Sequence, residues 1–217
     1  DRTSRGLGDV YKRQVLSPLD SILHRKAILH AGLVSVEPAT GHIKAWVGGI
    51  DYKHFQYDNV GQSRRQVGST FKPFVYATAL RLGAEPCDEF PNQKTCIDLP
   101  PGSDPPRWCP DNSDEDYGEM VTLEYALANS MNTVTAKLIK DYGTRRVIDL
   151  AHALGIESDI PNVPSIALGV AQLTLRELVS ANASLVNQGV YVEPTFIARI
   201  EDPVSYTHLT LPTTDRG

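Results

Sequence analysis

The chain has 217 residues, of which 41% are hydrophobic and 22% charged, and its formal net charge is -5. This length and composition are typical of a single globular domain of ordinary size. The acidic balance argues against a nucleic-acid partner, because phosphate binding needs a basic stripe, and no run approaches the roughly 20 apolar residues of a membrane span.

Both ends of the chain are predicted to be translated sequencing adapter. The DVYKRQ of residues 9–14 can be encoded by DNA whose reverse complement, read in another frame, encodes the VSYTH of residues 204–208. Such non-native segments have to be set aside before the fold is considered. We therefore expect residues 1–14 and 203–217 to be adapter and residues 15–202 to be native sequence.

The first predicted element is a β-hairpin. Residues 33–37 (LVSVE) and 42–47 (HIKAWV) alternate apolar and polar side chains, and the PATG between them is typical of a turn. Gly48 and Gly49 end the second strand.

A helix is predicted over residues 69–82 (STFKPFVYATALRL). Its apolar side chains recur at helical spacing, and Gly83 follows the last of them. Pro73 falls in the first turn, where its missing N–H costs little. The helix should therefore begin at or just before Ser69.

Residues 85–119 contain ten acidic residues, seven prolines and all three cysteines, without sustained periodicity. We predict a surface segment. Cys87, Cys96 and Cys109 permit one disulfide with a thiol left over, or no bridge at all. The DNSDEDYGE within it faintly resembles a calcium loop, but its glycine is misplaced, so a solvated loop is favoured.

Further helices are predicted towards the C-terminus, most of them in a compact helical cluster. Their starts and ends come from capping residues and glycines, including an N-cap at Thr122 and a capping box of Thr174 with Glu177. The predicted helices cover residues 122–129, 133–142, 144–154 and 174–188. An extended segment is expected over residues 190–200.

Ser69 and Lys72 form an S-x-x-K motif. Residues three apart share a helix face, so the lysine amine can reach the serine hydroxyl. A serine becomes a good nucleophile when a base takes its proton, and burial can lower the pKa of a lysine far enough for that role. The alternative is an N-cap serine followed by an exposed lysine.

Ser130 and Asn132 form a second motif, S-x-N, at the junction of two predicted helices. The hydroxyl could relay a proton, and the amide could hold a substrate peptide bond through its donor and acceptor. The alternative is an ordinary turn, which Ser and Asn favour. Another S-x-N, at Ser180 and Asn182, is explained by an ordinary helix and is discounted.

At these motifs the chain resembles the transpeptidase domain of bifunctional (class A) penicillin-binding proteins, whose superfamily uses S-x-x-K, S-D-N and K-T-G motifs. The resemblance extends through RRQVGSTFKPFVYATAL, LEYALANSMNTVTAKL, VEPATGHIKAWVGG and IALGVAQLTLRELVSANASLVNQGVYVEPTFIARIED. Met131 replaces the Asp of S-D-N, which is compatible with class A proteins. The resemblance implies an α+β, β-lactamase/transpeptidase-like fold, with an antiparallel sheet flanked by helices and an all-helical subdomain.

The resemblance also implies a reaction, peptidoglycan D,D-transpeptidation through an acyl-serine. Ser69 would be the nucleophile, Lys72 its base, Ser130 a proton shuttle and Asn132 a substrate-binding amide, with neither cofactor nor metal. The expected partners are stem peptides ending in D-Ala-D-Ala and β-lactam antibiotics. A D,D-carboxypeptidase, a serine β-lactamase and a non-catalytic β-lactam sensor remain alternatives.

The chain departs from the family in having no K-T-G sequence. In the family this strand contributes to the oxyanion hole, which is often worth about 10²- to 10³-fold in rate. We therefore expect a truncated domain, lacking its C-terminal strands and inactive by itself. Its parent should act in the periplasm or on the extracytoplasmic face of the inner membrane, held by a missing upstream anchor.

Overall fold

The structure is a computed structural model that describes residues 16–113, 117–201 and 208–209. The segments expected to be adapter, 1–14 and 203–217, lie outside the described residues apart from 208–209, so their origin stays a prediction. The chain divides into two units, Asp1–Ala31 and Gly32–Gly217.

The first unit contains one described helix, α1 (Pro18–Ala27). The hydroxyl of its N-cap residue, Ser17, accepts a hydrogen bond of 3.1 Å from the Asp20 amide. This helix is not among the elements predicted from the sequence. The signal was present, because serine is a favoured N-cap and proline a favoured first helical residue.

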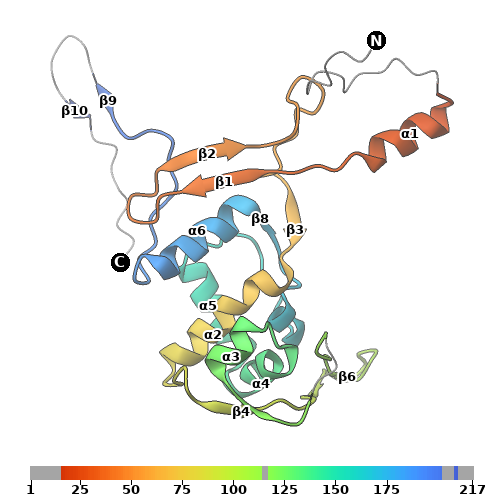
Figure 1. Cartoon of the computed structure of the whole chain (residues 1–217), viewed down its shortest axis with the longest axis vertical. Coiled ribbons are helices and arrows are strands. Elements are labelled where there is room, and N and C mark those ends of the chain that lie inside the picture. Colours follow the sequence, from red (N-terminus) through yellow and green to blue (C-terminus); the bar gives the residue numbers. More distant parts are fainter. Residues whose placement is uncertain (1–15, 114–116, 202–207, 210–217) are drawn as a thin grey trace, which may run out of the picture. The chain divides into compact units, whose positions relative to one another are not determined.

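The second unit begins with the predicted hairpin. Strands β1 (Leu33–Val36) and β2 (Ile43–Val47) are antiparallel, with Leu33 opposite Val47 and Val36 opposite Ile43. Helix α6 (Leu175–Val186) packs against β1 (Figure 1). The predicted hairpin is thereby confirmed.

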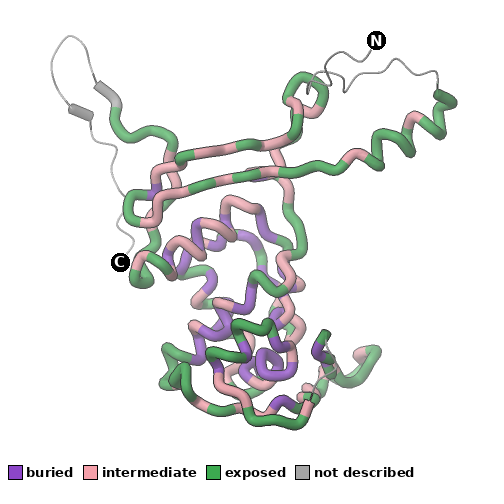
Figure 2. Tube along the Cα trace, in the orientation of Figure 1, coloured by how far each residue is buried: buried purple, intermediate pink, exposed green. Residues whose placement is uncertain are grey.

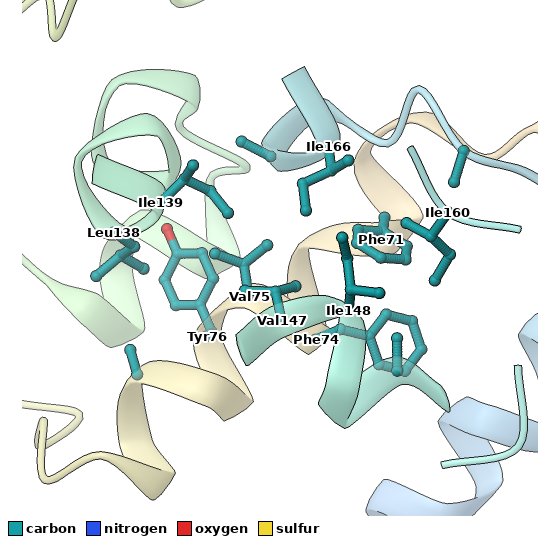
Figure 3. Close-up of a cluster of buried hydrophobic side chains, with 14 of the residues drawn as sticks. Phe71, Phe74, Val75, Tyr76, Leu138, Ile139, Val147, Ile148, Ile160 and Ile166 are labelled. Carbon is teal, nitrogen blue, oxygen red and sulfur yellow. The ribbon is translucent and has the colours of Figure 1, made fainter. Parts of the chain in front are cut away.

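The core of the second unit is helical. The 3₁₀ turn η1 (Gly68–Phe71) runs directly into α2 (Lys72–Arg81), which packs against α3 (Leu123–Ala128), α4 (Asn132–Tyr142), α5 (Thr144–Ala153) and the 3₁₀ turn η2 (Pro164–Leu168). The buried residues in Figure 2 gather around these helices. The side chains that meet there are drawn in Figure 3 and include Phe71, Phe74, Val75, Leu138, Val147 and Ile166.

This packing confirms the predicted helical cluster. Burying one such side chain contributes about 1.5–3 kcal/mol relative to leaving it exposed. The core residues of α2 follow Lys72 directly, so the same contacts that stabilise the domain also fix the start of this helix.

The acidic segment 85–119 contains two short strand pairs among its described residues. Strand β4 (Glu89–Pro91) pairs with β7 (Met120–Thr122), and β5 (Ile97–Asp98) pairs with β6 (Arg107–Trp108). A disulfide joins Cys96 to Cys109, whereas Cys87 is a free, exposed thiol. Of the two cysteine alternatives, the single bridge is the one observed.

The calcium-loop resemblance in residues 111–119 includes residues 114–116, which lie outside the described residues. Across the part of the chain that the structure describes, no three His, Cys, Asp or Glu side chains gather as a metal site would require.

A non-local strand pair joins the segment before η1 to the segment before α6. Strands β3 (Arg64–Gln66) and β8 (Gln172–Thr174) are antiparallel, and β8 leads into α6. The predicted capping box is confirmed, because the Thr174 hydroxyl accepts from the Glu177 amide and the Glu177 carboxylate accepts from the Thr174 amide. The pairing of β3 with β8 fixes the backbone immediately before η1.

The C-terminal segment is less regular than predicted. Residues 190–199 follow an irregular path, with one isolated bridge from Thr195 to His42, and Pro194 has no N–H to give to a strand ladder. Strand β9 (Ile200–Glu201) then pairs with β10 (His208–Leu209).

The described sheets differ in extent from the single flanked sheet that was expected. Each sheet formed by the described residues has two antiparallel strands. Among the same residues, no helix is long and apolar enough to span a bilayer.

Candidate active site

Ser69 lies in η1, one turn before the first residue of α2, and its side chain is exposed. The turn is anchored to the segment that precedes β8: the Val67 amide donates to the Ala171 carbonyl at 3.2 Å, and the Gly68 amide to the Gly169 carbonyl at 3.0 Å. The residue before the serine is therefore held by backbone contacts on the opposite segment.

The contact between Gly68 and Gly169 is very close. A Cβ placed on Gly169 would lie 1.9 Å from the Gly68 carbonyl oxygen, and Gly169 has a φ of +68°. Both the space and the backbone conformation therefore require glycine at residue 169. This crossing sets the position from which the chain enters the Ser69 turn.

Lys72 is the first residue of α2 and is only 1% exposed. Its ammonium donates hydrogen bonds to the Ser130 carbonyl, to the Ser130 hydroxyl at 3.0 Å and to the Asn132 carboxamide oxygen at 2.7 Å. These three acceptors use the three donors of an ammonium. The alternative of an exposed lysine is excluded.

Burial lowers the pKa of Lys72 to about 8, because the charged form loses hydration. The Lys72 amine therefore exchanges between its charged and neutral forms close to neutral pH. A lysine in this state can hold a proton or accept one, which an ordinary surface lysine rarely does at the same pH.

Ser130 lies in the turn between α3 and α4. The Ser130 amide donates to the Leu127 carbonyl at 3.0 Å and the Met131 amide to the Ala126 carbonyl at 2.9 Å, which is the Schellman arrangement at a helix C-terminus. Ser130 occupies the left-handed position of that motif, with a φ of +54°. This position usually holds glycine, so a hydroxyl-bearing residue is unusual there.

Asn132 begins α4 and is held from two sides. Its carboxamide oxygen accepts from Lys72, and its amide nitrogen donates to the Asp111 carbonyl at 2.8 Å. The backbone amides of Asn132 and Thr133 donate to the side-chain oxygen of Asn112, at 2.9 and 3.1 Å. Asn112 is not among the site residues predicted from the sequence, because nothing local in a polar segment marks an asparagine that caps a distant helix.

The structure thus brings Lys72, Ser130 and Asn132 into direct contact. It does not show the expected contact between Lys72 and the Ser69 hydroxyl, which has no hydrogen-bond partner among the described residues. The reason is that all three ammonium donors are turned to Ser130 and Asn132, while Ser69 sits exposed in the preceding 3₁₀ turn.

The second S-x-N sequence is structural, as predicted. The Ser180 hydroxyl donates to the Arg176 carbonyl and the Asn182 amide donates to the Leu178 carbonyl, both within α6. A separate hollow lies at the end of the hairpin, lined by aromatic residues including Trp46 and Tyr52. None of the four predicted site residues lines it.

A comparison with known proteins finds a family whose model covers most of the chain. The family model "Penicillin binding protein transpeptidase domain" matches residues 31–216. Penicillin-binding protein 1A of Aquifex aeolicus is 36% identical over 176 residues, which are 80% of this chain and 24% of that protein. Penicillin-binding protein 2D of Bacillus subtilis is 32% identical over 179 residues, 82% of this chain and 26% of that protein. The chain therefore spans about a quarter of the length of these curated relatives.

Solved structures show the same fold. Penicillin-binding protein 1A from Haemophilus influenzae superposes with a TM-score of 0.75 at 29% identity, covering 84% of this chain and 27% of that one. PonA1 from Mycobacterium tuberculosis in complex with penicillin V has a TM-score of 0.68 at 23% identity, covering 88% and 53%. The fold is accordingly the α+β transpeptidase fold, and the chain belongs to the family of penicillin-binding protein transpeptidase domains.

Proposed function

We propose that the protein carrying these residues is a peptidoglycan D,D-transpeptidase that works through an acyl-serine. The observation that supports this most directly is the buried Lys72, whose pKa is lowered to about 8 and whose amine contacts Ser130 and Asn132. An amine in this state, one turn after an exposed serine, is suited to activate that serine as a nucleophile.

The proposed chemistry begins with Ser69. Its oxygen forms a bond to the carbonyl carbon of the penultimate D-Ala, and its proton passes to the neutral amine of Lys72. The Ser130 hydroxyl relays a proton to the leaving nitrogen as the peptide bond breaks and terminal D-Ala departs. An amine of a neighbouring stem peptide then attacks the acyl carbon and forms the cross-linking amide. As the bond to Ser69 breaks, the proton lost by that amine passes through Lys72 to the Ser69 oxygen.

The geometry supports separate roles for the other two residues. The Ser130 hydroxyl lies 3.0 Å from the Lys72 amine, which is within reach for proton relay. The carboxamide of Asn132 is fixed at both ends, and a fixed amide can orient a substrate peptide bond. General-base assistance of this kind is typically worth about 10²- to 10⁴-fold in rate.

β-Lactams should acylate the same serine, because their strained amide presents a similar carbonyl to Ser69. The relatives are named for penicillin binding, and penicillin-binding protein A of M. tuberculosis is described as a penicillin G acyl-enzyme complex. We place the whole protein outside the cytoplasm, anchored to the membrane, where its peptidoglycan substrate lies. No cofactor or metal is proposed.

The proposal applies to a protein in which these residues are joined to a K-T-G strand, since that sequence is absent from the chain. The test is labelling with a fluorescent penicillin, followed by peptide mass mapping, on the 217-residue chain and on the chain extended through a K-T-G segment. We expect a label on Ser69 in the extended form and little or none in the chain alone.

Two variants make the test specific. Ser69→Ala should abolish labelling of the extended form, whereas Ser180→Ala, in the second S-x-N sequence, should leave it within about twofold. Labelling of Ser69→Ala at the wild-type rate would refute the assigned nucleophile. Rapid release of the label would instead identify a hydrolase, and lasting acylation without any D-Ala release would identify a sensor.

A further inference from the structure

The turn that carries Ser130 and Asn132 touches a second segment of the chain on the side away from Lys72. The Asn132 side chain donates to the Asp111 carbonyl at 2.8 Å, and the backbone amides of Asn132 and Thr133 donate to the carboxamide oxygen of Asn112. The acidic segment 85–119 therefore contacts the candidate site at two adjacent residues.

Asn112 takes the place of the missing cap of α4. The N-cap residue of this helix, Met131, has no side-chain hydrogen bond to offer, so the first helical amides depend on another group. The carboxamide oxygen of Asn112 accepts from two of them, at 2.9 and 3.1 Å, although Asn112 lies 20 residues earlier in the chain. Because this cap comes from a distant segment, it fixes the position of the start of α4 relative to that segment and also stabilises the helix start.

Asn112 is itself firmly held. It is 5% exposed, and its amide nitrogen donates to the side-chain oxygen of Asn92 at 2.8 Å. The hydroxyl of Thr133 donates to the same Asn92 oxygen, also at 2.8 Å. The three buried side chains form a closed network, so a displacement of one carries to the others.

The backbone around this network is tied down on both sides. The Asn92 amide donates to the Glu119 carbonyl and the Gly118 amide to the Asn92 carbonyl, continuing the β4–β7 ladder. The Asp111 carboxylate pairs with Lys94 at 2.6 Å, and the Tyr117 hydroxyl donates to it. These contacts fix the backbone of segment 85–119 on either side of Asn112.

We propose that Asn112 is a positioning residue of the candidate active site, which fixes the turn that presents Ser130 and Asn132 to the Lys72 amine. It touches none of the reacting groups of the proposed reaction, and it acts through the two backbone amides that it holds. The catalytic meaning of this inference rests on the proposed function, but its geometric content does not.

A purely structural cap would predict only a loss of stability on removing Asn112. A positioning role predicts in addition that the surroundings of Lys72 change in the folded protein. With Asn112 gone, Ser130 and Asn132 lose their fixed register, so both the hydration of the Lys72 amine and its hydrogen bonds change, and the pKa of Lys72 shifts. The protonation of Lys72 is therefore a readout that a structural role alone would not move.

The test is an NMR titration of the lysine side chains, labelled with ¹³C and ¹⁵N, in the 217-residue chain. The Lys72 resonance is assigned by its loss in Lys72→Met. In Asn112→Ala we expect its titration midpoint to move away from the wild-type pKa, for which burial predicts about 8. The matched control is Asn162→Ala, which removes the exposed asparagine that accepts from Thr144 at the start of α5 and should leave the midpoint unchanged.

If Asn112→Ala does not fold, Asn112→Ser gives the same test, because its shorter side chain cannot reach both amides but keeps a polar group in the network. An unchanged Lys72 midpoint in either folded variant would overturn the proposal. In the extended, acylating form, Asn112→Ala should also slow β-lactam acylation about 10- to 100-fold. Absence of acylation in the unsubstituted protein would count against the proposed function, and the titration would still decide the role of Asn112.

Discussion

Replacing Gly169 by alanine tests whether the glycine crossing positions the Ser69 turn. The new Cβ would meet three backbone atoms of Gly68, at 1.9, 2.6 and 2.7 Å, and backbone cannot swing away as a side chain can. A left-handed conformation costs a non-glycine residue about 1–2 kcal/mol, and overpacking typically costs about 1–3 kcal/mol. Gly169→Ala should therefore lower the free energy of unfolding by about 2–5 kcal/mol.

Gly189→Ala is the matched control, because Gly189 also has a positive φ, +83°, but nothing lies within 4 Å of its added Cβ. Gly189→Ala should lower the free energy of unfolding only by the cost of the left-handed backbone conformation, about 1–2 kcal/mol. Urea unfolding of both variants isolates the steric part as the difference between them. In the extended form, folded Gly169→Ala should also label with fluorescent penicillin at least about tenfold more slowly, because Gly68 precedes Ser69. Equal stability losses in the two variants would refute the argument.

Three further outcomes follow from the described contacts. Changing Cys96 and Cys109 to serine should lower the free energy of unfolding by about 3 kcal/mol, from the entropy of the closed loop, while Cys87→Ser should stay within about 0.5 kcal/mol; urea unfolding with and without reductant checks both. Glu177→Gln should lower the free energy of unfolding by about 1–3 kcal/mol in urea at pH 7, because the buried carboxylate accepts hydrogen bonds that an amide cannot all accept. Burial raises the pKa of Glu177, but these hydrogen bonds lower it overall. The difference in stability should therefore shrink as the pH falls below 4.5. Because the pKa of Lys72 is lower in the folded state, the unfolded state holds more protons between pH 8 and 10.5. The free energy of unfolding of the wild type relative to Lys72→Met should therefore rise across this pH window, by at most roughly 3 kcal/mol. A difference between the two proteins that does not change with pH would contradict the lowered pKa.

Local signals predicted the elements whose causes are local. The alternation around the PATG turn predicted the hairpin, Thr122 predicted the start of α3, and Thr174 with Glu177 predicted the start of α6. The two helix starts depend on side chains within three residues of one another, and the hairpin on one continuous stretch, so the printed sequence contains all the information needed. The S-x-x-K and S-x-N motifs could likewise be located, because their residues are close in sequence.

The contacts between distant segments could not be predicted in this way. The sequence indicated that Lys72 would reach Ser69, but the structure turns its donors to Ser130 and Asn132, some 60 residues away. The role of Asn112 depends on the path of a segment without periodicity. The pairing of β3 with β8 likewise depends on the tertiary fold, since three-residue strands carry almost no signal of their own.

The left-handed backbone at Ser130 has a consequence for how this position can change. At a helix C-terminus of this type, glycine relieves the strain at no steric cost, and asparagine tolerates it better than most residues. Mutational drift under selection for folding alone would therefore move position 130 towards one of those two residues. A serine that is retained at position 130 therefore indicates selection for its hydroxyl. The residue at this position in related proteins reports whether each still needs that group.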